Sequence, residues 1–549
     1  MEFKKNQIVE LYIDDIGNEG EGIGHIDGYA LFLKDAVIGD KVRAKIIKTK
    51  KNYGFARVEE VIEASKDRVS PRCSKARQCG GCTLQHLAYE KQLEYKFNKV
   101  KNCLERIGGL ENIEEKMEPI LGMEEPFYYR NKAQFPVGYD KEGNLITGFY
   151  AGRTHHIIDC THCMIQHPVN EQILLKVLDY MKKNNITAYD EKTHKGLVRH
   201  IVTRVGFKTG EIMVCFVVNG SKKNLRNLEM LVDSLIEVEG MTSICVNINK
   251  EKTNRILGSK IEEVYGKPYI YDYIGNVKYQ IGPLSFFQVN PTQTKVLYEK
   301  AMEYADLKGE ETVWDLYCGI GTISLFLAQK AKKVYGVEIV KEAIDDARLN
   351  AKMNGFDNAE FFVGKAEEVL PREYEKNGVY ADTIVVDPPR KGCDSKLLET
   401  MVKMAPKRIV YVSCDPATLA RDLKVLSEQG YEVEKVCAVD QFSHSSHVET
   451  VVLLSQQKPD DTIEIDLDLD ELDATSAELK ATYQEIKDYV LKEFGLKVSN
   501  LYISQIKRKC GIEVGENYNL PKTENPKVPQ CPKEKEDAIK AALKYFAMI

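Results

Sequence analysis

The sequence predicts an α/β fold in which a small β-barrel and a mixed region precede a parallel sheet wrapped by helices. From about residue 283 to 456, strand-like runs such as KVYGVEI and ADTIVVD alternate with helix-like runs such as EAIDDARLNAKMNG. Alternation of this kind specifies a parallel sheet covered by helices. Near the N-terminus, short runs of alternating apolar and polar residues are broken by a glycine-rich stretch at 20–24. That pattern is typical of a small closed barrel.

The same patterns divide the chain into segments. In the central part, strand-like IMVCFVV and ICVNIN alternate with helix-like NEQILLKVLDYMKKN, which indicates a mixed α+β domain. We expect a barrel at 1–62, a central domain at 63–282, a sheet domain at 283–456, an acidic linker at 457–473 and a helical extension at 474–549.

Composition and charge favour a cytoplasmic protein without a membrane partner. The chain has 549 residues, 43% hydrophobic and 29% charged, which is ordinary for a globular protein. We find no apolar run long enough to span a bilayer and no signal-peptide pattern at the start. The net charge is −6, but residues 460–473 hold eight acids and no base, so the rest of the chain sums to +2. The body of the protein can therefore carry basic patches for nucleic acid.

Basic and aromatic side chains are mixed in the barrel segment KTKKNYGFARV. The bases are Lys48, Lys50, Lys51 and Arg57, and the aromatic residues are Tyr53 and Phe55. This mixture suits a groove for single-stranded nucleic acid, and a solvated hairpin is the alternative.

The cysteine spacing indicates a metal or cluster site. A cytosolic chain keeps its thiols reduced, so we do not expect structural disulfides among its 14 cysteines. Cys73, Cys79 and Cys82 lie within CSKARQCGGC, a spacing that is unlike incidental cysteines. A set of four thiolates holds either zinc or an iron–sulfur cluster, and the spacing alone does not choose between them.

A glycine loop between a strand and a helix indicates a cofactor site. Residues 315–322, DLYCGIGT, begin in the last residues of the strand TVWDLY and lead into the helix TISLFLA. The next strand ends in Glu338, a carboxylate suited to a ribose diol. The loop has G-x-G without the third glycine of a dinucleotide fingerprint, so an adenosyl cofactor without a diphosphate fits better. The later strand ADTIVVD runs into DPPR, which brings Asp387 to the same sheet edge.

These motifs, with SFFQVNP at 285–291 before them and SCDPATLARD and HSSHVET after them, resemble S-adenosylmethionine-dependent RNA uridine-C5 methyltransferases. The resemblance covers residue 1 to about 455. It implies a Rossmann-like methyltransferase sheet, an N-terminal OB-like barrel of the TRAM type and a central iron–sulfur domain. The implied cofactor contacts are Gln288, Tyr317, Glu338 and Asp387.

The resemblance also assigns the chemistry. Uracil C5 is a poor nucleophile, so its methylation calls for covalent activation by a thiolate at C6 and a base that removes the C5 proton. Cys414, which in isolation would be read as core filler, becomes the nucleophile, and Glu449 becomes the base. Cys318 in the glycine loop is a rival nucleophile that we interpret as packing.

The resemblance implies a 4Fe-4S cluster held by Cys73, Cys79, Cys82 and Cys163, with Cys160 as a competitor for the fourth place. Four ligands and a separate cofactor sheet argue against radical chemistry on S-adenosylmethionine. The barrel and the cluster favour 23S ribosomal RNA as the partner of a monomeric enzyme. The alternatives are the uridine of the tRNA T-loop, or a catalytically silent RNA-binding or assembly protein.

The helical extension reads as two helices, TYQEIKDYVLKEFG and SNLYISQIKRKCG. Ser499 or Asn500 is the expected N-cap of the second helix, and Gly511 follows its end. The bases at 507–509 suit a helix C-terminus, and a helix-turn-helix-like pair that contacts nucleic acid is the alternative.

Overall fold

The structure, a computed structural model, describes residues 3–152, 154–457, 483–510, 512, 531–546 and 548. It divides into two units, Met1–Lys458 and Pro459–Ile549. Nearly all of the predicted acidic linker, and Gly511, lie outside the described residues. Among the helices that are described, none is long and apolar enough to cross a membrane.

Six strands form the N-terminal sheet, in the order β1-β5-β6-β4-β3-β2. Their bounds are β1 (Ile8–Tyr12), β2 (Asp15–Ile16), β3 (Gly22–Ile26), β4 (Tyr29–Lys34), β5 (Lys41–Thr49) and β6 (Tyr53–Glu63). The sheet curls so that the N–H of Asp14, just after β1, donates to the oxygen of Ile23 in β3 at 2.9 Å. Aliphatic side chains such as Leu31 and Val42 fill the interior.

The glycine-rich stretch that we expected to interrupt the strands is partly a strand itself. Gly22 and Gly24 lie in β3. A Cβ on Gly22 would lie 2.8 Å from the Cβ of Ala36, and one on Gly24 would overlap the backbone oxygen of Tyr12. Glycine is therefore used here where two backbones approach closely as the sheet curls.

The central region holds a seven-stranded sheet in the order β10-β9-β8-β11-β12-β13-β14. Its strands are β8 (Lys132–Tyr139), β9 (Leu145–Tyr150), β10 (Ile157–Asp159), β11 (Val198–Val205), β12 (Ile212–Val218), β13 (Met241–Ile248) and β14 (Lys260–Tyr265). Helices α2 (Val169–Lys183) and α3 (Leu228–Ile236) share a hydrophobic cluster with one face of this sheet. Every residue of β11 and β12 is buried. Burial on both faces explains the continuous apolar sequence of β12, whereas β11 also buries Arg199, His200, Thr203 and Arg204.

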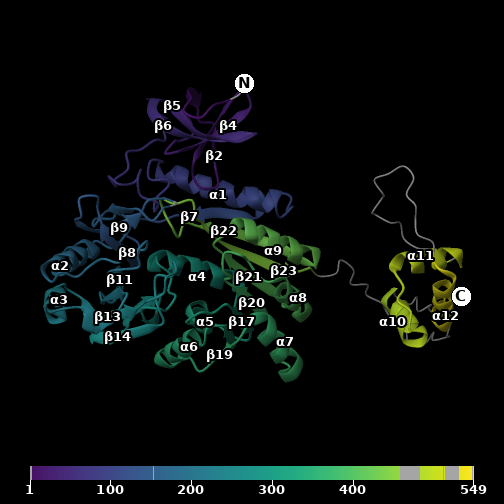
Figure 1. Cartoon of the computed structure of the whole chain (residues 1–549). Helices are drawn as coiled ribbons and strands as arrows, with labels where there is room; N and C mark the ends of the chain where they lie inside the picture. Colours follow the sequence, from purple (N-terminus) through teal and green to yellow (C-terminus); the bar gives the residue numbers. More distant parts are fainter. Residues whose placement is uncertain are drawn as a thin grey trace. The chain divides into compact units, whose positions relative to one another are not determined.

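An eight-stranded sheet forms the largest layer, in the order β19-β18-β17-β20-β21-β23-β22-β7 (Figure 1). Its strands are β17 (Thr312–Leu316), β18 (Lys333–Glu338), β19 (Ala359–Val363), β20 (Thr383–Val386), β21 (Arg408–Ser413), β22 (Tyr431–Val439) and β23 (Glu449–Gln456). Strands β17 to β21 pair in parallel, as the alternation predicts, and β23 pairs antiparallel with β21. The edge strand β7 (Met117–Leu121) comes from far upstream and pairs with β22.

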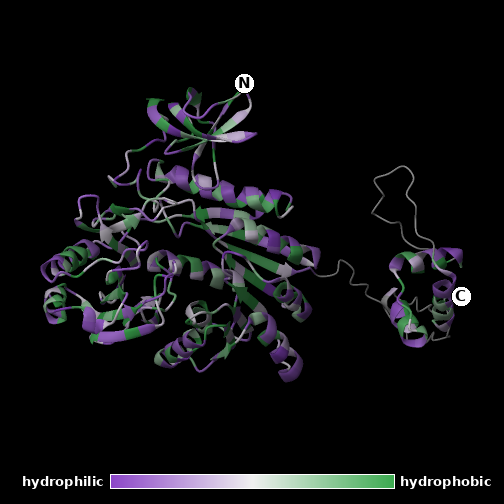
Figure 2. Cartoon of the chain, viewed as in Figure 1, coloured by the Kyte–Doolittle hydropathy of each residue, from purple (hydrophilic) through white to green (hydrophobic). Residues whose placement is uncertain are grey.

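Helices pack around this sheet, and a two-stranded hairpin, β15 (Ile270–Ile274) and β16 (Val277–Ile281), packs beside them. The helices are α1 (Tyr89–Arg106), α4 (Pro291–Ala305), α5 (Thr322–Ala328), α6 (Lys341–Asn354), α7 (Ala366–Asn377), α8 (Ser395–Met404) and α9 (Pro416–Glu428), with short turns η1 (Ile113–Lys116) and η2 (Lys222–Asn224) elsewhere. Figure 2 shows hydrophobic strands in the middle of the sheet and hydrophilic residues on the outer helix faces. This distribution is what burial of both sheet faces requires.

The second unit consists of α10 (Tyr483–Phe494), α11 (Asn500–Lys509) and α12 (Lys533–Tyr545) around a core of its own. The first two match the predicted helices, and Ser499 Oγ caps α11 by accepting the N–H of Tyr502 at 3.3 Å. Lys507 lies 4.6 Å from the ring of Tyr483. Because Lys507 contacts this ring inside the unit, the basic end of α11 contributes to the packing of the three helices.

Candidate active site

All six residues predicted to carry chemistry or bind the cofactor line one pocket of about 780 Å³. They are Gln288, Tyr317, Glu338, Asp387, Cys414 and Glu449. Four of them follow or end the parallel strands β17, β18, β20 and β21. Parallel strands present their carboxyl ends at one edge of a sheet, so residues far apart in the chain meet there.

The glycine loop after β17 forms one wall of this pocket. The N–H groups of Tyr317 and Cys318 both donate to the oxygen of Val337 at 3.0 Å, which ties the loop to β18. Gly321 precedes α5 at φ +82°, and a Cβ there would lie 3.2 Å from the ring of Phe361. The turn therefore needs glycine both for its backbone angle and for its packing.

Glu338 and Gln288 are held by backbone contacts at the pocket wall. The Oε1 of Glu338 accepts the N–H of Val340 at 2.9 Å, which orients the carboxylate at the end of β18. The backbone oxygen of Gln288 accepts from the side-chain amide of Asn131 at 3.0 Å. These contacts place a carboxylate and an amide on the same pocket as the glycine loop.

Two carboxyl groups beneath the loop are taken out of water. Asp315, at the start of the glycine loop, is buried and accepts a hydrogen bond from Ser324 Oγ, and burial raises its pKa to about 7. Burial and then the charge of Asp315 raise the pKa of Asp387. A buried carboxyl with a raised pKa is a common feature of functional sites.

Neighbouring charges act on both Cys414 and Glu449. Cys414 follows the last residue of β21 and is partly exposed, and burial, followed by the charges of Glu449 and Asp387, raises its thiol pKa to about 11. Glu449 begins β23 and is 3% exposed, and burial followed by the charge of Asp387 raises its pKa. The charge of Arg390 lowers the pKa of both groups. The rival Cys318 is buried in the hydrophobic core cluster and also lines this pocket.

Four residues that we did not predict line both this pocket and the neighbouring cysteine cavity. They are Arg130, Arg390, Phe442 and His447. Arg390 and His447 stand inside the motifs DPPR and HSSHVE, so their positions were visible in the sequence although their roles were not. Arg130 and Phe442 carry no local pattern that marks them.

The predicted cluster ligands Cys73, Cys79, Cys82 and Cys163 line one cavity of about 380 Å³, and so does Cys160. All five thiols are free. Burial raises the pKa of Cys82 to about 12, and the nearby Cys163, Cys79 and Cys73 add to that shift while Gln85 opposes it. In the part of the chain that the structure describes, no group of three or more potential ligands is placed to hold a metal ion, so a metal site is not shown.

The barrel presents the predicted aromatic and basic residues on its surface. The rings of Tyr53, Phe55 and Phe32 lie 5.7 to 5.8 Å apart. Tyr53 is 40% exposed, and the predicted bases of this segment are exposed around it. Exposed rings flanked by lysines suit the stacking of unpaired bases.

The comparisons with known proteins agree with this arrangement. The profile of the tRNA (uracil-5-)-methyltransferase family matches residues 88–457, and that of the TRAM domain matches residues 2–58. This chain belongs to that family. The family membership and the TRAM domain predicted from the motifs are thereby confirmed.

Relatives of the family cover nearly the same part of the chain. Uncharacterized RNA methyltransferases from Clostridium tetani and Halalkalibacterium halodurans are each 52% identical, over 453 and 451 residues, which is 82% of this chain and 97% of theirs. The crystal structure of Pyrococcus abyssi tRNA (uracil-54, C5)-methyltransferase in complex with S-adenosyl-L-homocysteine is 29% identical, with a TM-score of 0.66. That similarity covers 81% of this chain and all of the Pyrococcus chain. The methyltransferase fold is therefore shown, and the family match ends before the three-helix unit.

Proposed function

We propose that this protein transfers a methyl group from S-adenosylmethionine to C5 of a uridine in RNA, with Cys414 as nucleophile and Glu449 as general base. The observation that carries the proposal is the single pocket in which these two side chains meet the glycine loop. Membership of the family and the TRAM domain support RNA as the substrate.

The pocket fits an adenosyl cofactor. Its volume lies within the range usual for small-molecule sites, and its wall combines the glycine loop with the carboxylate of Glu338. In this proposal Glu338 accepts from the ribose hydroxyls, while Tyr317, Gln288 and Asp387 surround the rest of the cofactor. Binding of S-adenosyl-L-homocysteine by the Pyrococcus relative supports the same assignment. The cofactor supplies an electrophilic methyl group.

The chain's own side chains activate the uracil. The Cys414 thiolate forms an S–C6 bond, and the electron pair of the C5–C6 double bond moves toward O4, which makes C5 nucleophilic. After C5 gains its methyl group, Glu449 removes the C5 proton, the double bond re-forms and the S–C6 bond breaks. The raised pKa of Glu449 suits a group that must hold this proton near neutral pH.

We propose 23S ribosomal RNA as the substrate. A TRAM barrel joined to a four-cysteine segment supports this choice, because the ribosomal RNA enzymes of the family commonly have both. The tRNA T-loop is the second candidate, and the Pyrococcus relative, whose name states tRNA uracil-54, favours it.

A 4Fe-4S cluster on Cys73, Cys79, Cys82 and Cys163 is part of the proposal. The fit rests on free, partly buried thiols around one cavity, whose donor chemistry suits iron–sulfur clusters. Since this cavity shares Arg130 and Arg390 with the active pocket, we assign the cluster a structural or RNA-organising role. Iron and sulfide analysis of anaerobically purified protein tests it, and stoichiometric zinc without sulfide would contradict it.

Methyl-labelled S-adenosylmethionine tests the whole proposal. The protein is incubated with unmodified 23S rRNA or tRNA, and labelled nucleotides are mapped by nuclease digestion and mass spectrometry. We expect 5-methyluridine at discrete positions in the rRNA. Label only in tRNA would overturn the substrate choice, and no label in either would favour the silent RNA-binding protein.

A further inference from the structure

One face of α1 holds the segment that leads into Glu449. This segment, residues 440–448, contains the pocket residues Phe442 and His447 and is called the catalytic loop below. Gln92 Oε1 accepts the N–H of His444 at 2.9 Å. Lys96 Nζ donates to Asp440 Oδ1 at 2.5 Å and to the oxygen of Phe442 at 2.8 Å. The catalytic loop is therefore fixed to the helix at several points.

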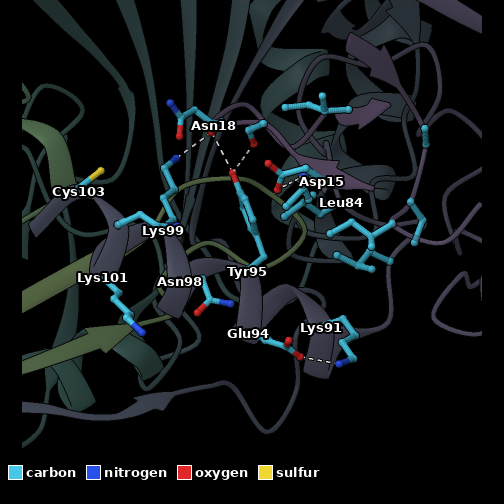
Figure 3. Close-up of a pocket in the computed structure, with 18 of the residues that line it drawn as sticks. Asp15, Asn18, Leu84, Lys91, Glu94, Tyr95, Asn98, Lys99, Lys101 and Cys103 are labelled. Carbon is cyan, nitrogen blue, oxygen red and sulfur yellow. Dashed lines mark hydrogen bonds and ion pairs between the residues drawn. The ribbon is translucent and has the colours of Figure 1, made fainter. Parts of the chain in front are cut away.

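Lys99 extends this attachment to the barrel. Its Nζ donates to the oxygen of Ser446 in the catalytic loop at 2.9 Å and to the oxygen of Asn18 in the barrel, also at 2.9 Å. The hydroxyl of Tyr95 donates to the oxygens of Gly17 and Asn18 at 3.0 and 2.9 Å. Figure 3 shows Lys99 and Tyr95 reaching the same turn of the barrel. One ammonium group thus joins two segments that are distant in the sequence.

The residues of α1 that hold the catalytic loop share one face of the helix and are largely buried. Gln92, Lys96 and Lys99 are spaced four and three residues apart, which places them on one face of the helix. Lys96 is fully buried and Lys99 is partly buried, and this burial lowers the pKa of both. Hydrogen bonds that are shielded from water in this way are stronger than exposed ones. Lys99 also lines a groove of about 840 Å³ between α1 and the barrel, which leaves the link next to open surface.

We propose that Lys99 is a positioning residue that couples the barrel to the catalytic loop and so sets the placement of Glu449. The coupling rests on the proposed function, because Glu449 acts as a base only in that reaction. Ser446 lies three residues before Glu449, so a change at the barrel turn reaches the base through a short, fixed segment. Binding of RNA to the barrel thereby affects the position of Glu449, although Lys99 itself touches no substrate.

Lys99→Met tests the link, with Lys91→Met as the matched control. Lys91 lies on the same helix and lines the same groove, but it pairs with Glu94 of its own helix at 2.5 Å. We expect Lys99→Met to lower kcat by roughly 10- to 100-fold, because small displacements of catalytic groups have effects of that size. KM for RNA should stay within about twofold, Lys99→Arg should restore most of the rate, and Lys91→Met should match the wild type. Unchanged kcat in Lys99→Met would overturn the proposal.

Amide hydrogen exchange of the full chain without RNA tests the coupling independently of activity. In Tyr95→Phe, whose lost contacts involve only the barrel turn, exchange should speed up in residues 15–20 and also in the catalytic loop. Faster exchange confined to the barrel turn would show that no coupling passes through Lys99. If the wild type failed to methylate RNA while this exchange pattern appeared, the proposed function would fail and the mechanical link would stand.

Discussion

Replacement of Glu449 by glutamine separates the first and last steps of the proposed reaction. Glutamine keeps the size of the side chain at a site that is 3% exposed, so the pocket should retain its shape. It cannot accept the C5 proton, and loss of a general base costs roughly 100- to 10,000-fold in rate. Attack by Cys414 is not blocked, because the charge of Glu449 is one of the causes that raise the thiol pKa.

The variant should therefore be nearly inactive and should accumulate a covalent RNA adduct. Single-turnover assays measure the methyl transfer, and denaturing gels with labelled RNA measure the adduct. Exposed Glu428→Gln on α9 is the control and should behave as the wild type. Burial raises the pKa of Glu449 from 4.5 to about 8, so this group lowers the stability of the folded state progressively as the pH rises through that interval. Glu449→Gln should therefore not lower the melting temperature at pH 8. A variant with half of the wild-type rate would refute Glu449 as the base.

Three further predictions follow from other parts of the structure. Because the pKa of the Cys414 thiol is raised to about 11, kcat/KM should rise about tenfold per pH unit from pH 6 to 8, and a flat profile would contradict thiolate attack. Cys82→Ser should lose most of the bound iron, whereas Cys160→Ser should keep it. A colorimetric iron assay measures both, and equal loss in the two variants would contradict the assigned ligand set. Gly24→Ala should destabilise the barrel by about 1–3 kcal/mol and speed amide exchange in β3, because the new Cβ would overlap the backbone oxygen of Tyr12. Unchanged exchange would contradict that close approach.

The parallel sheet and its pocket edge were predictable because both follow from local signals. The alternation of strand and helix placed Tyr317, Glu338, Asp387 and Cys414 at strand ends, and the sheet-edge rule then brought them together. For Glu449 the local pattern indicated only a position before an apolar strand, and the motif resemblance supplied its role.

Other features depend on contacts between distant segments, which leave no periodicity in the sequence. The pairing of β7 with β22 joins residues more than 300 positions apart, and nothing near 117–121 marks that partner. Arg130 reaches the pocket from the central region, and Lys99 gains its role only through two backbone oxygens. Such roles follow from the geometry of the folded chain and not from a motif.

Trapping the covalent intermediate tests the central claim most directly. RNA that carries 5-fluorouridine at the target position presents a C5–F bond that the base cannot break, so the S–C6 bond persists after methyl transfer. The protein is incubated with this RNA and S-adenosylmethionine, digested, and analysed by mass spectrometry. Our account predicts a methylated fluorouridine attached to the peptide that contains Cys414. Attachment to Cys318, or methylation without any protein adduct, would contradict it.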